Sequence, residues 1–168
     1  MKKLFMIAAF TAASFATFAQ EGGSTTKGFK FSVGVNAALP IGDLADISTF
    51  GAGIDVQGQY WFSDKVAATL DAGFTSLFGK DDFESTSLIP VRAGVRYMAT
   101  PQIYLTGKVG MGNLKYNADG ADGVTAFGYA VGAGYKINEK FDLGLTYDGY
   151  SKNSQTNSMI NLRVGYTF

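Results

Sequence analysis

Hydrophobic and polar residues alternate strictly along residues 158–168, at the end of the chain. Successive side chains of a β-strand point to opposite faces, so this alternation predicts a strand with one apolar and one polar face. The residues of the apolar face are Ile160, Leu162, Val164, Tyr166 and Phe168. The segment therefore predicts a strand that lies between an apolar and a polar environment.

The same two-residue period recurs in seven earlier segments. These expected strands cover residues 28–39, 50–62, 66–78, 87–98, 103–113, 124–137 and 141–150. The connections between them are rich in Gly, Pro, Asn and Asp, and long connections alternate with short ones. The pattern predicts an all-β fold, an eight-stranded antiparallel up-and-down β-barrel. Pro90 lies on the polar row of its segment, where it indicates a bulge or a strand end.

All charged residues of the eight segments lie on the polar row. Side chains can fill the interior of an eight-stranded barrel, and buried charges require partners of opposite sign. A tight turn at residues 63–65 would set Gln57 opposite Asp71, with Asp71 within a pair or two of Arg92 and Arg96 on the next strand. We therefore expect a charge network inside the barrel, formed by Lys30, Asp55, Asp71, Arg92, Arg96, Lys108, Lys136, Asp142, Asp148 and Arg163.

Aromatic residues of the apolar row gather beside the short turns and the chain ends. A belt of aromatic residues at one height around a transmembrane barrel marks its membrane–water interface. This favours a barrel whose apolar row faces lipid over one whose apolar row lines a ligand cavity. The expected periplasmic girdle consists of Phe29, Phe31, Tyr60, Phe62, Tyr97, Tyr135, Phe141, Tyr166 and Phe168.

The chain resembles the small eight-stranded bacterial outer-membrane β-barrel family, described as porin-like or OmpX-like. The resemblance covers residues 20–168 and rests on segments 34–43, 89–97 and 162–168. It implies a transmembrane barrel with both termini in the periplasm, surrounded by outer-membrane lipid and lipopolysaccharide. Tyr166 and Phe168 resemble the C-terminal assembly signal that the barrel-insertion machinery of that membrane reads.

The start of the chain has the parts of a secretory signal peptide. A basic region and an apolar run end at Thr17-Phe18-Ala19, which fits a cleavage site. The apolar run is shorter than the ~20 residues that a transmembrane helix requires. We expect residues 1–19 to form a signal peptide, residues 20–27 a short periplasmic N-terminus and residues 28–168 the outer-membrane barrel.

Composition excludes whole classes of site. The chain has no His and no Cys, which excludes catalytic triads, thiol nucleophiles, His-based zinc sites and disulfides. Asp55 and Asp71 can in principle do acid–base chemistry, but neutralisation of neighbouring basic residues is the stronger interpretation. Residues 117–123 contain a fragment of a calcium-loop pattern, and an Asp-Gly turn explains them better. We expect no enzyme and no cofactor.

Three functions remain open at this point. The first is a non-enzymatic outer-membrane barrel with a packed polar interior, acting in envelope structure or in surface contact through its loops. The second is a narrow porin-like channel for small solutes, and the third is a soluble periplasmic lipocalin-like ligand-binding barrel. Lys and Arg total 14, as do Asp and Glu, a balance that gives no support to nucleic-acid binding. The sequence indicates no partner for the loops.

Overall fold

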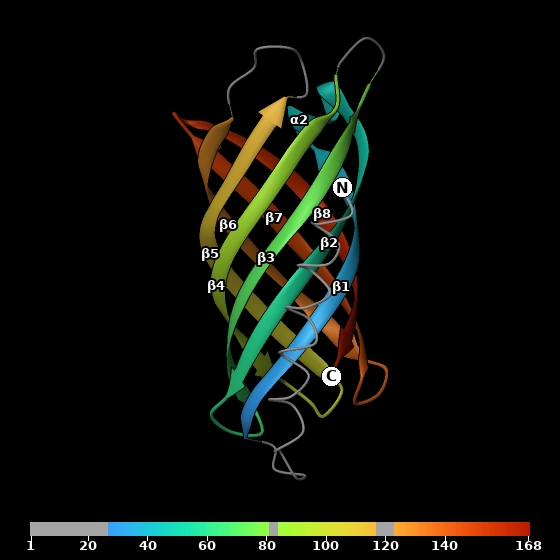
Figure 1. Ribbon diagram of the computed structural model, residues 1–168, viewed down its shortest axis with the longest axis vertical. Coiled ribbons are helices and arrows are strands. Elements are labelled where there is room, and N and C mark those ends of the chain that lie inside the picture. The colour runs from blue at the N-terminus through green and yellow to red at the C-terminus, as the bar shows by residue number, and fades with distance from the viewer. Residues whose placement is uncertain (1–26, 81–83, 117–122) are drawn as a thin grey trace, which may run out of the picture.

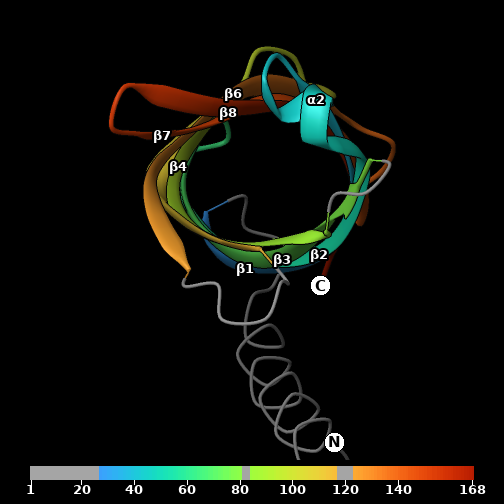
Figure 2. The same cartoon turned by 90° about the horizontal axis from the view of Figure 1, so that it is seen from above.

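The computed structural model describes residues 27–80, 84–116 and 123–168, and their strands close into one barrel (Figure 1, Figure 2). Each strand pairs in antiparallel fashion with its neighbours in sequence, and β1 closes the ring on β8. The eight-stranded up-and-down barrel is therefore confirmed. Its strands are β1 (Gly28–Ile41), β2 (Ser48–Trp61), β3 (Val66–Gly79), β4 (Thr86–Met98), β5 (Ile103–Tyr116), β6 (Val124–Lys136), β7 (Phe141–Lys152) and β8 (Gln155–Thr167).

The expected signal peptide, residues 1–19, lies outside the described residues, as does most of the expected N-terminal segment 20–27. Within the part of the chain that the structure describes, no helix is long and apolar enough to cross a membrane.

The two ends of the barrel differ in their connections. At the turn end, residues 62–65, 99–102 and 137–140 form short turns, and the C-terminus lies beside them (Figure 1). At the loop end, the connection after β1 contains a short helix, α2 (Leu44–Ile47), where the sequence predicts only a loop. The reason is Leu44, whose side chain is buried among the apolar residues inside the barrel rim. Figure 2 shows α2 at this rim.

The connection between β7 and β8 is shorter than expected. The sequence predicts a loop over residues 151–157, whereas only Asn153 and Ser154 separate the two strands. Their φ angles of 50° and 66° are those of a tight two-residue hairpin turn, a conformation that Asn tolerates better than most residues. The hydroxyls of Ser151 and Thr156 lie 2.7 Å apart and extend the pairing. The alternation of long and short connections is therefore wrong at this hairpin.

Pro90 interrupts one ladder without shifting its register. The pairs Ala72–Val91 and Thr75–Leu88 flank a gap between β3 and β4 at the height of Pro90. Proline has no backbone N–H to donate there, yet pairing resumes in the same register beyond the gap. The expected bulge or strand end is therefore wrong, and β4 runs through this position.

The alternation along the strands separates two faces, as expected. Ile54 on the outer face is 63% exposed, whereas Asp71 and Asp148 on the inner face are 3% and 1% exposed. A lipocalin-like barrel requires the opposite arrangement, with its apolar row around an internal ligand. The soluble alternative is therefore wrong, and the apolar exterior is complementary to lipid hydrocarbon.

Candidate functional site: the filled barrel interior

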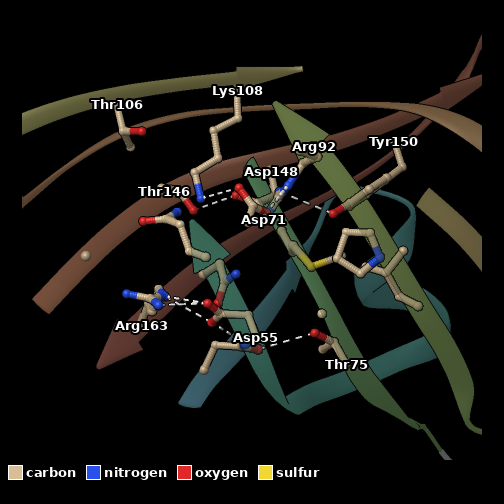
Figure 3. A pocket seen from close by; sticks show the side chains of 18 of the residues that line it. Asp55, Asp71, Thr75, Arg92, Thr106, Lys108, Thr146, Asp148, Tyr150 and Arg163 are labelled. Carbon is tan, nitrogen blue, oxygen red and sulfur yellow. Dashed lines mark hydrogen bonds and ion pairs between the residues drawn. The ribbon is translucent and has the colours of Figure 1, made fainter. Parts of the chain in front are cut away.

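Four charged side chains form the loop-side cluster of the interior: Asp71, Arg92, Lys108 and Asp148. Arg92 Nε lies 3.1 Å from Asp71 and its Nη1 lies 2.7 Å from Asp148, so one guanidinium joins β3 to β7 (Figure 3). Lys108 Nζ lies 2.8 Å from the other oxygen of Asp71. The hydroxyl of Tyr150 accepts a further hydrogen bond of 3.3 Å from Arg92. Each charge in this cluster therefore faces at least one charge of opposite sign.

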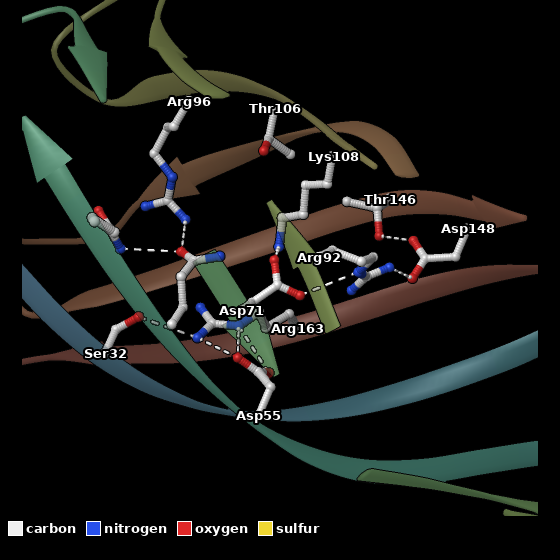
Figure 4. Close-up of polar contacts among 12 residues, drawn as sticks. Ser32, Asp55, Asp71, Arg92, Arg96, Thr106, Lys108, Thr146, Asp148 and Arg163 are labelled. Atoms are coloured by element: carbon white, nitrogen blue, oxygen red, sulfur yellow. Dashed lines mark hydrogen bonds and ion pairs between the residues drawn. The ribbon is translucent and has the colours of Figure 1, made fainter. Parts of the chain in front are cut away.

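A second group, the turn-side cluster, is formed by Asp55, Arg96, Asp142 and Arg163. Arg163 Nε and Nη2 each lie 2.8 Å from Asp55 Oδ1 (Figure 4). Asp142 accepts a hydrogen bond of 2.6 Å from the Tyr104 hydroxyl and lies 3.7 Å from Arg163 and 3.9 Å from Arg96. Arg163 on β8 thereby ties β2 to β7, and its Nη2 also donates a hydrogen bond of 3.3 Å to Ser32 on β1.

Arg96 completes the turn-side cluster through contacts with neutral side chains. Its Nη2 donates a hydrogen bond of 3.1 Å to Gln57, and its guanidinium carbon lies 3.9 Å from the centre of the Tyr104 ring. A guanidinium above an aromatic face gains a cation–π attraction that is strongest away from water. Gln57 in turn lies opposite Asp71 across the β2–β3 pair, the register expected from the turn at residues 63–65.

Glycines beside Arg163 leave room for its guanidinium. A Cβ added to Gly34 would lie 2.6 Å from both Arg163 Nε and Asp55 Oδ2. At these distances any side chain at this position would force Arg163 and Asp55 to move from their present ion pair. The glycines of the polar row therefore leave the space that the long charged side chains occupy.

The two clusters balance their charge: four carboxylates face three Arg and one Lys. Buried ions lose their hydration, so a charge without a partner is strongly destabilising, while a complete set of partners offsets that penalty. The side chains come from strands all around the ring, β2, β3, β4, β5, β7 and β8. The balanced network therefore ties opposite walls of the barrel to each other.

Two apolar layers lie above and below the charges, and the sequence reasoning missed them. The loop-end layer consists of Ala38, Leu44, Leu77, Leu88, Leu114, Ala126, Tyr150 and Met159, with Ile47 packed against it. The turn-end layer consists of Trp61, Ala67, Met98 and Tyr104. A signal was present, because Leu77, Leu88 and Met159 are apolar residues on an otherwise polar row. They stand at the strand ends, where the row leaves the charged middle.

The space left between these side chains is small. The internal cavity has a volume of about 40 Å³ and is lined by residues of both charge clusters, together with Pro90 and Thr106. A cavity of about 10–15 Å³ suffices for one water molecule, so this cavity holds a few waters at most. The interior is therefore a packed core with a small wet pocket.

Lys30 and Lys136 do not join the charge network that the sequence predicts for them. Among the residues that the structure describes, neither forms an ion pair, and both line pockets at the turn end. The Lys30 ammonium lies 5.9 Å from the centre of the Trp61 ring. Both lysines stand at the ends of their strands, β1 and β6, where long side chains reach solvent more easily than the barrel interior.

The aromatic residues expected as a girdle lie on or beside the outer surface at the turn end. Tyr166 is central among them, since its ring centre lies 5.1 Å from those of Phe141 and Phe168. Phe168 also lies 6.3 Å from Phe31. The remaining members, exposed on the same outer row, are Phe29, Tyr60, Phe62, Tyr97 and Tyr135.

The structure brings no metal site together in the part of the chain that it describes. Asp55 and Asp71, considered above for acid–base chemistry, are each held by a basic side chain, Arg163 for the first and Arg92 with Lys108 for the second. The calcium-like fragment at residues 117–123 lies outside the described residues except for Gly123.

Comparisons with known proteins agree with this architecture. No curated protein matches the sequence. Ail of Yersinia pestis is similar in structure, with a TM-score of 0.62 at 17% identity, covering 84% of this chain and 99% of that one. Neisserial surface protein A gives 0.62 at 15% identity, covering 87% and 98%. The N-terminal β-barrel domain of Pseudomonas aeruginosa OprF gives 0.61 at 18%, covering 83% and 97%.

These likenesses show the fold, and the sequence itself shows the family. Residues 5–168 match the family described as "Outer membrane protein beta-barrel domain". The apolar outer face and the closed ring of strands are the features that such a family requires in the membrane. This chain belongs to the outer membrane protein beta-barrel domain family.

Proposed function

We propose that this protein is a non-enzymatic integral outer-membrane barrel whose own side chains close its interior. The observation that carries the proposal is the filling of the lumen by two balanced charge clusters, which leave a cavity of about 40 Å³. A continuous aqueous path for solutes needs far more space than that. The protein then contributes to envelope structure by its presence in the membrane, without transport.

The apolar layers support the same proposal independently. Leu77 and Leu88 at the loop end are fully buried, as is Tyr104 at the turn end. An ion that passed through the barrel would lose its hydration at each apolar layer, which is costly in a medium of low dielectric constant. Charges in the middle and apolar groups at both ends thus oppose conduction at successive heights.

The topology that we propose places the turn end and both termini in the periplasm. Apart from the tight turn between β7 and β8, the longer connections lie at the loop end, and short turns at one end with longer connections at the other are the usual arrangement of bacterial outer-membrane barrels. The aromatic residues of the turn end would then lie at the periplasmic interface of the outer membrane with water, in contact with lipid. Lipopolysaccharide would surround the loop end, and Tyr166 with Phe168 would serve the insertion machinery as an assembly signal. Residues 1–19 would be removed on export.

Surface contact through the loop end is a second part of the proposal. The described residues of this end include the exposed carboxylates Asp43, Asp46 and Glu84, which stand on the connections and not on the packed wall. The similar structure from Yersinia pestis is described as an attachment invasion locus protein, a description of that protein alone. Loop-end contacts in the present protein would be set by its own connections.

Electrical recording in planar lipid bilayers tests the closed interior. We expect no steady single-channel openings from the folded protein, whose insertion is verified by protection of the barrel from added protease. Steady, reproducible openings that scale with salt concentration would contradict the proposal and favour the porin-like alternative. Catalysis is tested apart from conduction, by exposing outer-membrane lipid to the protein and looking for modified products.

A further inference from the structure

The turn end of the barrel contains a pocket that the charge network does not fill. Its volume is about 410 Å³, within the size range of pockets that bind small molecules. Lys30 on β1 and Lys136 on β6 both line it, so the pocket extends across the mouth of the barrel. Trp61 and Met98 of the turn-end apolar layer line its inner side. We call this space the turn-end pocket.

The charge of the turn-end pocket is predominantly positive. Lys30, Lys65 and Lys136 line it, together with one carboxylate, that of Asp64. The carboxylates of the barrel interior already face the four basic side chains of the two clusters. Among the described residues, Lys30 and Lys136 form no ion pair. Glu139 and Lys140 at the same mouth offset each other in charge, so an excess of positive charge remains there.

Two buried hydrogen-bond donors at the same place also lack a partner. Trp61 is 6% exposed and Arg96 is 5% exposed. Neither Trp61 Nε1 nor Arg96 Nε has an acceptor among the described residues. Both side chains line a smaller pocket that shares Lys30, Trp61 and Lys136 with the turn-end pocket. Buried donors without acceptors are rare in folded proteins, and each one calls for an explanation.

The unmatched groups are all of one chemical kind. Lysine ammonium groups, an indole N–H and a guanidinium N–H donate hydrogen bonds and accept none. The complementary group is one that carries negative charge and offers two or more acceptor oxygens. Met98 and Pro101 add apolar surface on the wall of the turn-end pocket.

We propose that the turn-end pocket binds the phosphate or carboxylate group of a small anionic molecule. Lys30 and Lys136 neutralise the oxyanion from two sides, and the indole N–H of Trp61 donates to it. Met98 and Pro101 contact the non-ionic part of the same ligand. In the topology proposed above the pocket opens to the periplasm, so its ligand is either a free anion or the phosphate headgroup of a lipid.

Tryptophan fluorescence tests this site directly, because Trp61 is the only tryptophan of the chain. The protein, folded in an uncharged detergent, is titrated with inorganic phosphate and, in parallel, with sodium chloride at equal ionic strength. We expect a saturable change of Trp61 emission with phosphate and only gradual screening with chloride. The variant Lys30→Gln/Lys136→Gln should weaken the apparent phosphate affinity about tenfold or more.

A matched control removes the same charge at the opposite end of the barrel. Lys115→Gln/Lys152→Gln changes two exposed lysines of the loop end and should leave the phosphate response unchanged. Line broadening of the phosphate ³¹P resonance gives a second readout that does not depend on Trp61. Equal responses to phosphate and chloride would overturn the proposal, and so would equal weakening by both double variants.

A second experiment, in lipid bilayers, distinguishes a free anion from a lipid headgroup as the source of the oxyanion. Trp61 emission is compared in nanodiscs of phosphatidylcholine with and without phosphatidylglycerol, in the absence of free phosphate. A phosphate response in detergent, with equal Trp61 emission in the two kinds of nanodisc, assigns the pocket to a soluble anion. An emission change that requires phosphatidylglycerol and is lost in Lys30→Gln/Lys136→Gln assigns it to a lipid headgroup. No response in either arm would overturn the inference.

Discussion

The charged middle of the barrel interior and the apolar layers at its two ends fill one lumen by different physical means. In the middle, Arg92 and Arg163 satisfy specific carboxylates across the barrel. At the loop end, Leu77 and Leu88 fill space without directed partners. Electrostatic pairing fails when one member is lost, whereas apolar packing fails in proportion to the volume removed. The predictions below separate these two modes of closure.

The largest effect is expected from Asp71→Ala in the middle layer. The substitution leaves Arg92 with one carboxylate and Lys108 with none, so it should lower the free energy of unfolding by about 3–5 kcal/mol. Urea titration of the protein in lipid vesicles measures the change. A loss of ~1 kcal/mol or less would mean that water already solvates these charges, as at a protein surface.

Leu77→Ala tests the loop-end layer in the same assay. Leu77 is 0% exposed, and its truncation should lower the free energy of unfolding by about 2–5 kcal/mol through lost contacts and a residual cavity. The volume-conserving Leu77→Met is the control, with an expected loss below ~1.5 kcal/mol. Equal losses for both variants would show that shape, rather than volume, sets the stability of this layer.

The outer face provides the contrast to both interior layers. Val164→Arg places a charge on the lipid-facing row and should cost about 2–4 kcal/mol near the middle of the bilayer. Ile137→Arg, at an exposed apolar residue of the turn after β6, should cost only about 0–1 kcal/mol near the interface. If both variants were equally tolerated in vesicles, the outer row would not face hydrocarbon.

Deletion of Phe168 should have the smallest effect on stability and a larger one on assembly. Its exposed ring packs against the rings of Phe31 and Tyr166, and its backbone N–H donates a hydrogen bond of 2.9 Å to the Phe31 carbonyl, so the loss in vitro should be about 1–2 kcal/mol. In cells, the amount of barrel in the outer membrane should fall several-fold, while Phe141→Leu should assemble normally. A deletion variant that reaches the membrane at wild-type levels would remove the proposed assembly role of Phe168.

Sequence alternation was sufficient to predict the barrel and its faces, because a period of two fixes which row each residue joins. It also gave the pairing of Gln57 with Asp71, since a tight turn at residues 63–65 fixes the register of β2 against β3. The sequence alone therefore places the polar residues of these positions inside the barrel.

Alternation does not report height along the barrel, and this explains which inward residues lie outside the charge network. Lys30 and Lys136 share the row of Arg92 but stand at the strand ends, beyond the balanced clusters. Leu88 shares the same row and packs in the loop-end layer instead. The α2 helix and the turn at Asn153 depend on local contacts that a binary pattern does not contain.

A double-mutant cycle on Asp55 and Arg163 tests the central claim, a closed and largely dry interior, most directly. Arg163 Nε and Nη2 each lie 2.8 Å from Asp55 Oδ1. The two residues are replaced by Ala, first singly and then together. Urea titration in vesicles should give a coupling free energy of about 1.5 kcal/mol or more, as for close charge pairs away from water. Leu77→Ala combined with Arg163→Ala serves as the distant control and should be additive within about 0.5 kcal/mol. A coupling between Asp55 and Arg163 no larger than that control would contradict the packed interior and indicate a water-filled channel.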